Sequence, residues 1–144
     1  MGASFAALPI MAGRDAAGIK GFVFMSGFIV LLVLIHEVGH ALAALAYRAK
    51  VSGILLYARG GVCFIEDTLE DRTGRILFIC GGVLAQAAAF ICVALAIWLL
   101  GPPTSYWMVC GAIVFLGFNP IFMLFSIVPY GRNDAAQLIQ ELKG

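Results

Sequence analysis

Three long apolar runs dominate the hydrophobic pattern of the chain. They cover residues 21–47, 76–100 and 106–128. At about 1.5 Å of rise per residue, each run as a helix is long enough to cross the roughly 30 Å hydrocarbon core of a bilayer. The pattern predicts an all-α polytopic membrane protein with three transmembrane helices, organised as a single domain over residues 1–144.

One polar loop, residues 48–75, separates the first and second runs. It holds five Lys or Arg and four Asp or Glu residues. Within it, residues 53–58 and 62–65 are rich in β-prone side chains and flank the sequence Arg59-Gly60-Gly61, which predicts a small β-hairpin. Residues 1–20 lack a basic stretch before their apolar residues, so we expect a short leader there rather than a signal peptide.

Composition narrows the class of protein further. The chain is 62% hydrophobic and 12% charged, whereas soluble domains carry about 25% charged residues. This composition excludes a soluble globular domain. The net charge of only +1 gives the protein no strong positive field, so we expect no nucleic-acid partner. The four cysteines lack C-x-x-C spacing, so we expect free thiols that are buried as small apolar groups, and no cysteine zinc site.

The distribution of basic residues predicts the orientation in the membrane. Lys and Arg gather in the 48–75 loop and in the tail after residue 128, and the turn at 101–105 has none. Basic loops stay on the cytoplasmic side. We therefore expect a multi-pass protein of a prokaryotic cytoplasmic membrane, with the N-terminus outside and the polar loop, its hairpin and the C-terminus inside.

The first apolar run contains three titratable polar residues near its end, His36, Glu37 and His40. His36 and His40 are the two histidines of the chain. Such side chains are costly at membrane depth and therefore point to function. Residues four apart on a helix share one face, so both imidazoles could hold one zinc ion. Glu37 lies beside them, where a carboxylate could accept a proton from water. The arrangement is the H-E-x-x-H pattern of zinc hydrolases.

A catalytic zinc site normally has three protein ligands, so a third one is needed. Asp134 is the best placed, because Pro129 ends the third run and lets the chain turn back toward the histidines. From position alone, Asp134 is equally well explained as the N-cap of a helix formed by the tail. The other acidic candidates are Asp15, Glu66, Asp67, Glu70, Asp71 and Glu141.

Three motifs in chain order resemble the site-2 protease family of intramembrane zinc metalloproteases. They are His36-Glu37-Val38-Gly39-His40, "GGVLAQ" at 81–86, similar to the family's G-x-P-x-x-N, and "SIVPYGRND" at 126–134. The last keeps the family spacing of proline at plus three and aspartate at plus eight. The resemblance implies a minimal three-span core with one Zn²⁺ per chain, in which Asp134 is the third ligand.

The chain departs from the family pattern at four positions. Val83 replaces a proline, Gln86 and Ser126 replace asparagines, and Ala135 replaces a glycine. Gln86 and Ser126 keep hydrogen-bonding groups, so both are candidates for substrate contacts. Asn119 is a further candidate, with a hydrogen bond between helices as the competing explanation.

The predicted hairpin supplies the remaining candidates for substrate binding, Gly60, Gly61 and Val62. In the family, the corresponding hairpin lies near the active site; a plain turn would also explain the paired glycines. A substrate unwound for cleavage needs new partners for its backbone groups in a membrane. A strand beginning at Val62 could provide them by strand addition.

These features predict an intramembrane zinc metalloprotease that cleaves a peptide bond in or next to a transmembrane segment, in regulated intramembrane proteolysis or in signal- or pro-peptide processing. The expected partners are a membrane-anchored protein or peptide substrate, the lipid bilayer and a separate regulatory or adaptor protein. One alternative is a catalytically inactive, protease-derived membrane binding protein, which the four departures favour and Glu37 opposes. A membrane metal transporter is a third hypothesis, but it would need further metal ligands along a pathway across the membrane.

Overall fold

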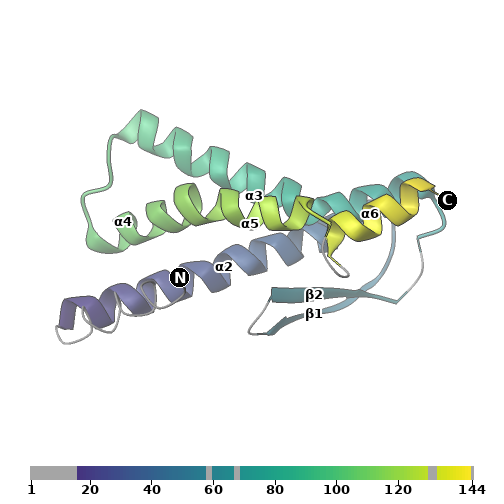
Figure 1. Cartoon of the computed structure of the whole chain (residues 1–144), viewed down its shortest axis with the longest axis horizontal. Helices are drawn as coiled ribbons and strands as arrows, with labels where there is room; N and C mark the ends of the chain where they lie inside the picture. Colours follow the sequence, from purple (N-terminus) through teal and green to yellow (C-terminus); the bar gives the residue numbers. More distant parts are fainter. Residues whose placement is uncertain (1–15, 58–59, 67–68, 130–132, 144) are drawn as a thin grey trace.

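The computed structural model describes residues 16–57, 60–66, 69–129 and 133–143, and Figure 1 shows their arrangement. Most of the expected leader, together with Asp15, Arg59 and Asp67, lies outside the described residues. The elements in chain order are α2 (Ala16–Ala46), β1 (Val51–Tyr57), β2 (Gly60–Ile65), α3 (Arg72–Leu100), α4 (Tyr106–Ala112), the π-helical η1 (Ile113–Phe118), α5 (Asn119–Ile127) and α6 (Asp134–Lys143).

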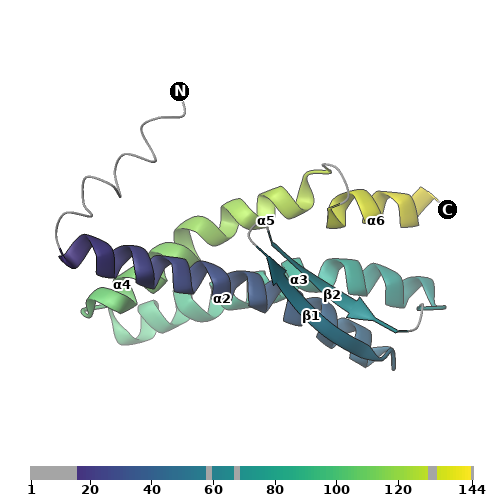
Figure 2. The same ribbon diagram turned by 90° about the horizontal axis from the view of Figure 1, so that it is seen from below.

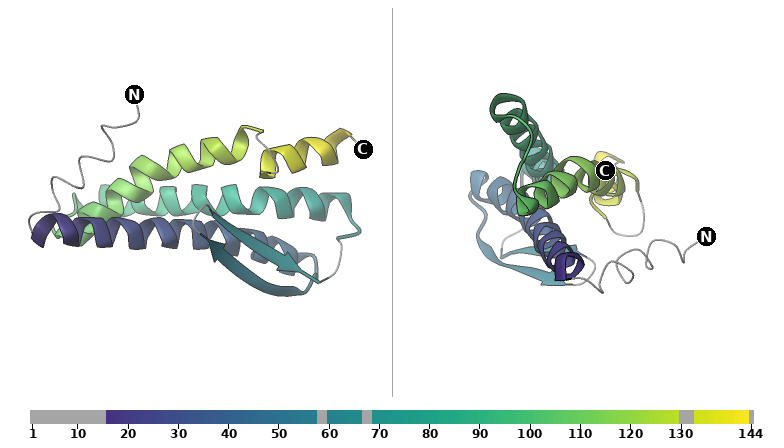
Figure 3. Two further views of the ribbon diagram at one scale, coloured as in Figure 1. Left: turned by 60° about the horizontal axis from the view of Figure 1, so that its bottom comes forward. Right: turned by 90° about the vertical axis from the view of Figure 1, so that its left-hand side faces the viewer.

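The predicted fold class is confirmed. Three helical stretches are long and apolar enough to cross a membrane, namely Gly18–Ala46, Arg72–Leu100 and Tyr106–Ile127. They lie side by side as a bundle, which Figure 3 shows from the side and from one end. Many of their large apolar side chains are exposed, as expected for surfaces that face lipid rather than water. A small buried core of Leu32, Val114 and Phe115 joins the first and third stretches.

The first two spans begin earlier than their apolar runs. Helix α2 begins at Ala16 rather than residue 21, and it ends at Ala46, just before Arg48 adopts a left-handed φ of 61°. Helix α3 begins at Arg72 rather than residue 76, because the Asp71 side chain caps it by accepting a hydrogen bond from the Gly74 backbone N–H at 3.1 Å. A capping side chain of this kind lets a helix begin within polar sequence, before the apolar run starts.

Helices α2 and α3 cross closely at two glycines. A Cβ atom on Gly39 would collide with the Gly81 carbonyl oxygen, and a Cβ on Gly81 would lie 2.5 Å from the Gly39 carbonyl oxygen. Small residues at a crossing let two membrane helices approach to backbone contact. The crossing lies beside His40, so it brings a defined face of α3 against the histidines.

The third span is wound more loosely in its middle than an α-helix. The π-helical segment η1 comes immediately before Asn119 and Pro120. Proline lacks an N–H and crowds the carbonyl one turn earlier, so a widened turn accommodates it without ending the helix. The Asn119 side chain, fully buried, donates a 2.9 Å hydrogen bond to the Gln86 backbone carbonyl and ties α5 to α3.

The hairpin also forms as predicted, between α2 and α3. Strands β1 and β2 pair antiparallel, with Leu55 opposite Val62 and Ile54 opposite Cys63. Val62 and Phe64 are exposed on one face of β2, and Cys63 and Ile65 turn inward on the other. Figure 2 shows the two strands of the hairpin lying against α2.

The four cysteines are free thiols, as predicted. Their predicted burial is wrong for three of them, since only Cys110 is buried. Cys80 and Cys92 belong to α3, where most positions of a span in a three-helix bundle lie on the outer surface, and Cys63 belongs to the two-stranded hairpin, which has no second sheet among the described residues to bury it.

Candidate active site

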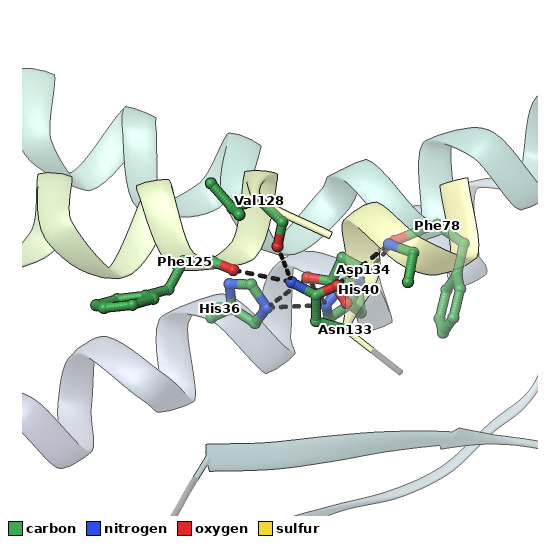
Figure 4. A network of polar contacts seen from close by, with 8 residues as sticks. His36, His40, Phe78, Phe125, Val128, Asn133 and Asp134 are labelled. Carbon is green, nitrogen blue, oxygen red and sulfur yellow. Dashed lines mark hydrogen bonds and ion pairs between the residues drawn. The ribbon is translucent and has the colours of Figure 1, made fainter. Parts of the chain in front are cut away.

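The two histidines of α2 point toward one another and toward the start of α6. His36 Nε2 lies 3.1 Å from His40 Nε2. The Asp134 Oδ2 atom lies 3.1 Å from His36 Nε2 and 3.6 Å from His40 Nε2. Figure 4 shows the three side chains converging from two elements that are far apart in the sequence. Among the described residues, these three form the one group of His, Cys, Asp or Glu ligands that could hold a metal ion.

The orientation of His40 is fixed by α3. Its Nδ1 atom lies 2.6 Å from the Phe78 backbone carbonyl. A carbonyl oxygen only accepts hydrogen bonds, so Nδ1 of the neutral ring carries the proton and Nε2 presents a lone pair. Metal-bound histidines are oriented by this kind of contact. His36 has no corresponding contact: its Nδ1 atom is buried without a hydrogen-bond partner in the described part of the chain.

Asp134 is the first residue of α6, but it does not cap that helix. Asn133 does so, because its Oδ1 accepts a hydrogen bond from the Ala136 backbone N–H at 3.1 Å. Its Nδ2 donates to the carbonyls of Phe125 and Val128, at 2.8 and 2.7 Å, near the end of α5. Capping by Asn133 leaves the Asp134 carboxylate available to the histidines, and the competing N-cap explanation for Asp134 does not describe its contacts.

The three groups fit a zinc ion. Tetrahedral zinc with ligand bonds of about 2.0–2.1 Å places its ligand atoms about 3.3–3.4 Å apart. The observed separations of 3.1, 3.1 and 3.6 Å bracket that value. Lone pairs of two neutral imidazoles and a carboxylate directed at one point repel unless a cation or proton lies between them. Geometry and donor chemistry therefore both suit a divalent metal.

The charge state of Asp134 suits the same role. Burial alone would raise the pKa of its carboxyl, but hydrogen bonds and charge interactions with His36 and His40 outweigh burial and lower the pKa well below its usual range. By contrast, burial and the nearby Glu37 raise the pKa of the Cys63 thiol in the hairpin. Cys63 is therefore a neutral thiol at neutral pH and not a competing thiolate ligand.

Glu37 is buried, with 4% of its surface exposed, and lines the same cavity as His36, His40 and Asp134. Gly61 of β2 lies directly against it, because a Cβ atom there would collide with the Glu37 Cγ atom. The hairpin thus packs directly against the side chain of Glu37. Only a glycine permits so close an approach.

Gly82 has the corresponding role toward the imidazoles. A Cβ atom at this position would lie 2.5 Å from His36 Nε2 and 2.6 Å from His40 Nε2. Any larger residue would displace at least one ring. Gly82 belongs to the "GGVLAQ" stretch, but sequence alone assigned it no part in the site.

A cavity of about 840 Å³ opens around these groups, between α2, the hairpin, α3, α5 and α6. Five of the six predicted substrate-binding residues line it: Gly60, Gly61, Val62, Gln86 and Ser126. Asn119 is not among the lining residues and lies behind Gln86, whose carbonyl it holds. The side-chain Oε1 atom of Gln86 is buried and has no hydrogen-bond partner within the described residues.

The alternative acidic ligands are engaged elsewhere or point away. Asp71 caps α3, Glu66 lies 3.9 Å from Lys50, and Glu141 pairs with Arg75 at 2.7 Å. Glu70 is exposed. Asp15 and Asp67 lie outside the described residues. In the parts of the chain that the structure covers, Asp134 is therefore the acidic residue that meets the histidines.

Three contributors to the site were not found from the sequence: the Phe78 carbonyl, Gly82 and Asn133. Asn133 carried a detectable signal, since asparagine is a favoured N-cap and a helix-forming stretch follows it. The other two act through a backbone carbonyl and through a missing side chain, and both depend on how α3 packs against α2.

Three apolar helices around a convergent His-His-Asp group define a membrane protein with a candidate metal centre. The family model for Peptidase M50B-like proteins matches residues 10–133, and the chain belongs to this family, which is related to the site-2 proteases. Peptidases of this kind are zinc-dependent. No curated protein matches the chain. The family match ends one position before Asp134, so the case for that residue rests on the geometry.

Proposed function

We propose that the protein is an intramembrane zinc metalloprotease that hydrolyses a peptide bond in or next to a transmembrane segment of a membrane-anchored protein or peptide. One observation carries the proposal: His36, His40 and Asp134 converge at ligand spacing inside a cavity that also contains the buried Glu37. A family of peptidases and three candidate membrane spans agree with it.

In this proposal His36, His40 and Asp134 hold one Zn²⁺ per chain. Zinc, when bound, supplies Lewis acidity that polarises a carbonyl and makes water more acidic. Glu37 accepts the proton of the attacking water and delivers it to the leaving amine. The contact between Glu37 and Gly61 limits the motion of the carboxyl group, which keeps the proton acceptor in place for both steps.

The walls of the cavity support a substrate that comes from the membrane. Ile29 and Val33 of α2 face it from one side, and Phe122 of α5 faces it from another. These apolar side chains suit a hydrophobic segment, whereas the polar end at Glu37 suits water and the peptide group. Cleavage requires the segment to lose its helical hydrogen bonds, and within lipid these groups need new partners.

We propose that strand β2 provides them, by pairing with the unwound substrate in the manner of strand addition. Val62→Pro or Phe64→Pro removes a backbone donor, so each should impair cleavage while zinc content stays normal. Val62→Thr keeps the donor and should be mild. If both proline variants cleaved at the wild-type rate, the substrate would have to be held by another segment than β2.

The proposed orientation places the polar loop and the C-terminus in the cytoplasm. Exposed aromatic residues Trp98, Tyr106 and Trp107 cluster around the short 101–105 turn, at the end of the bundle opposite the polar loop. Aromatic side chains favour the membrane–water interface, which supports full embedding of the spans. Reporter fusions at residues 70 and 144 should both report cytoplasm; opposite sides would contradict the three-span arrangement. The prokaryotic host and an adaptor protein stay predictions.

The decisive experiment combines metal analysis of the purified protein with cleavage of model transmembrane peptides. Wild type should hold about one zinc per chain and cleave, and Glu37→Gln should keep the zinc and lose cleavage by several orders of magnitude. Wild-type turnover by Glu37→Gln would refute the role of Glu37. The alternative, a catalytically inactive binding protein favoured by the departures at Val83, Gln86, Ser126 and Ala135, predicts that wild type is as inactive as the variant.

A further inference from the structure

Helix α6 carries Asp134 into the candidate metal centre, yet it has little packing to hold it there. It is ten residues long, and Ala135 is its one buried residue. Ile139 and Leu142 on the same helix are exposed. Helices of this length are marginal on their own. Besides its packing against α3 and α5, polar groups near its two ends fix the position of α6.

Asn133 provides the contact at the first end, through its hydrogen bonds to α5 and to Ala136. A contact at one end fixes where a helix begins but leaves its direction free. A rotation of α6 about that point would carry the Asp134 carboxylate away from the imidazoles. A second attachment is needed to keep the direction.

Two arginines of α3 supply this second attachment. Arg75 Nε donates to the Glu141 carboxylate at 2.7 Å. Arg72 Nη2 donates to the backbone carbonyls of Glu141 and Leu142, both at 3.1 Å. Carbonyls in the last turn of a helix lack partners within the helix, and a cation there also suits the helix dipole. Figure 3 shows α6 lying alongside the beginning of α3.

Arg75 is itself firmly placed. Its Nη1 atom donates to the carbonyls of Leu69 and Glu70, at 2.8 and 2.7 Å, just before α3 begins. The fork of the guanidinium group lets one side chain hold the loop and α6 together, which a lysine could not do. Arg75, Phe78 and Gly82 are spaced by three and four residues and share one face of α3. That face therefore orients His40, gives both imidazoles room and anchors the helix of Asp134.

We propose that Arg75 is a positioning residue for the metal centre: its ion pair with Glu141 fixes α6 and thereby holds Asp134 against His36 and His40. The inference rests on the zinc site proposed above. Glu141 is seven residues beyond Asp134, which is about 10 Å along a helix. Arg75 thus acts on zinc through α6 and not by touching the metal.

The test is a zinc competition titration on the purified full-length protein, with wild type, Glu141→Gln, Arg75→Gln and the double variant. Each single change should weaken zinc binding about two- to fivefold, the scale of a partly exposed ion pair. The double variant should be no weaker than the worse single variant, because both changes remove the same contact. Glu66→Gln, which removes the exposed Lys50–Glu66 pair of the hairpin, is the matched control and should bind zinc as wild type does.

The Asp134→Ala background separates positioning from a general loss of structure. If Arg75 acts through Asp134, then Glu141→Gln should have no further effect on zinc affinity once Asp134 is gone. A further loss of affinity in that background, or an equal loss in Glu66→Gln, would overturn the proposal. So would wild-type affinity in Glu141→Gln when Asp134→Ala alone weakens binding. Equal zinc binding by wild type and Asp134→Ala would instead refute the zinc site itself, which keeps the two failures distinct.

Discussion

The candidate metal centre is built from two arms of unlike construction. The α2 arm supplies His36, Glu37 and His40 from five consecutive positions of a 31-residue helix that crosses α3 at backbone contact. The α6 arm supplies Asp134 from a ten-residue helix that is held by Asn133 and by the arginines of α3. Glu37 and His40 are buried, whereas the Asp134 side chain is 20% exposed.

The difference shows which part of the centre is open to adjustment. The spacing of the two histidines follows from helix geometry and cannot change without breaking α2. The distance to Asp134 depends on a few polar contacts, each of which contributes about 1 kcal/mol or less at partly exposed positions. In the proposed zinc site, the α6 arm is therefore the part in which small changes adjust the affinity for zinc, and the α2 arm provides a fixed frame for it.

Removing one ligand from each arm should give the largest effects and should separate their structural costs. His40→Ala and Asp134→Ala should each weaken zinc binding by more than the roughly 10- to 100-fold that an outer-shell partner contributes. In the presence of a chelator, His40→Ala should also lower the free energy of unfolding by about 2 kcal/mol, since it opens a cavity and leaves the Phe78 carbonyl unpaired. Asp134→Ala should lower it by less than about 1 kcal/mol.

Zinc titration and thermal unfolding in detergent measure the two quantities. Equal structural costs for His40→Ala and Asp134→Ala would show that α6 is as integral to the fold as α2 is, and would remove the distinction between the arms.

Gly82→Ala should disturb the α2 arm without replacing any of the proposed metal ligands. The new methyl group would lie 2.5 Å from His36 Nε2, so a ring must move. Overpacking of this kind costs about 1–3 kcal/mol, which corresponds to roughly 5- to 150-fold in zinc affinity. Gly27→Ala is the matched control, because the space beside Gly27 in the same membrane helix α2 is open. If both variants bound zinc like wild type, α3 would not define the space for the imidazoles.

The two arms also differ in how far the sequence predicted them. The α2 arm follows from one local rule, since residues four apart on any helix share a face, and the three spans follow from hydropathy alone. Asp134 was the best placed of several acidic residues, but its position could not distinguish a metal ligand from a helix N-cap, and the resemblance to a family favoured the ligand. Its contacts depend on Asn133 and on the pairing of Arg75 with Glu141, 66 positions apart in the chain.

Other parts of the site could not be predicted because they involve no distinctive side chain. Gly82 contributes by having no side chain, which leaves room for both imidazoles. Phe78 contributes its backbone carbonyl, which every residue type possesses. Both depend on the crossing of α2 and α3 at Gly39 and Gly81. The π-helical widening before Pro120 likewise depends on how the third span packs, although the proline itself was evident.

Chelation of zinc should loosen one arm and leave the other. Zinc bound by Asp134 adds a third attachment to α6, so its removal should speed hydrogen exchange of the α6 backbone amides by about tenfold, the change that about 1.4 kcal/mol of lost protection produces. Amides of α2 around His36 and His40 should exchange at an unchanged slow rate, because the helix persists without metal. Hydrogen exchange followed by mass spectrometry, with and without a chelator, measures both segments in one experiment. Equal acceleration in the two segments would mean that zinc holds the whole bundle together.

The smallest effect is expected from the cap of α6, because it can be weakened in two stages. Asn133→Ala removes the acceptor for the Ala136 N–H and both donors to α5. Asn133→Ser keeps a cap acceptor but cannot bridge to the carbonyls of Phe125 and Val128 as the longer amide does. Loss of an N-cap costs about 1 kcal/mol, so the alanine variant should bind zinc about fivefold more weakly and the serine variant about twofold.

Zinc titration resolves a difference of this size when each variant is also compared in the Asp134→Ala background. There, both changes at Asn133 should lose their effect, since the cap influences zinc only through the position of Asp134. An undiminished effect in that background would mean that Asn133 supports the histidine side of the cavity directly. The two arms of the centre would then share Asn133 as a support. The start of α6 would in that case belong to the fixed frame around the histidines, and only the rest of the helix would be adjustable.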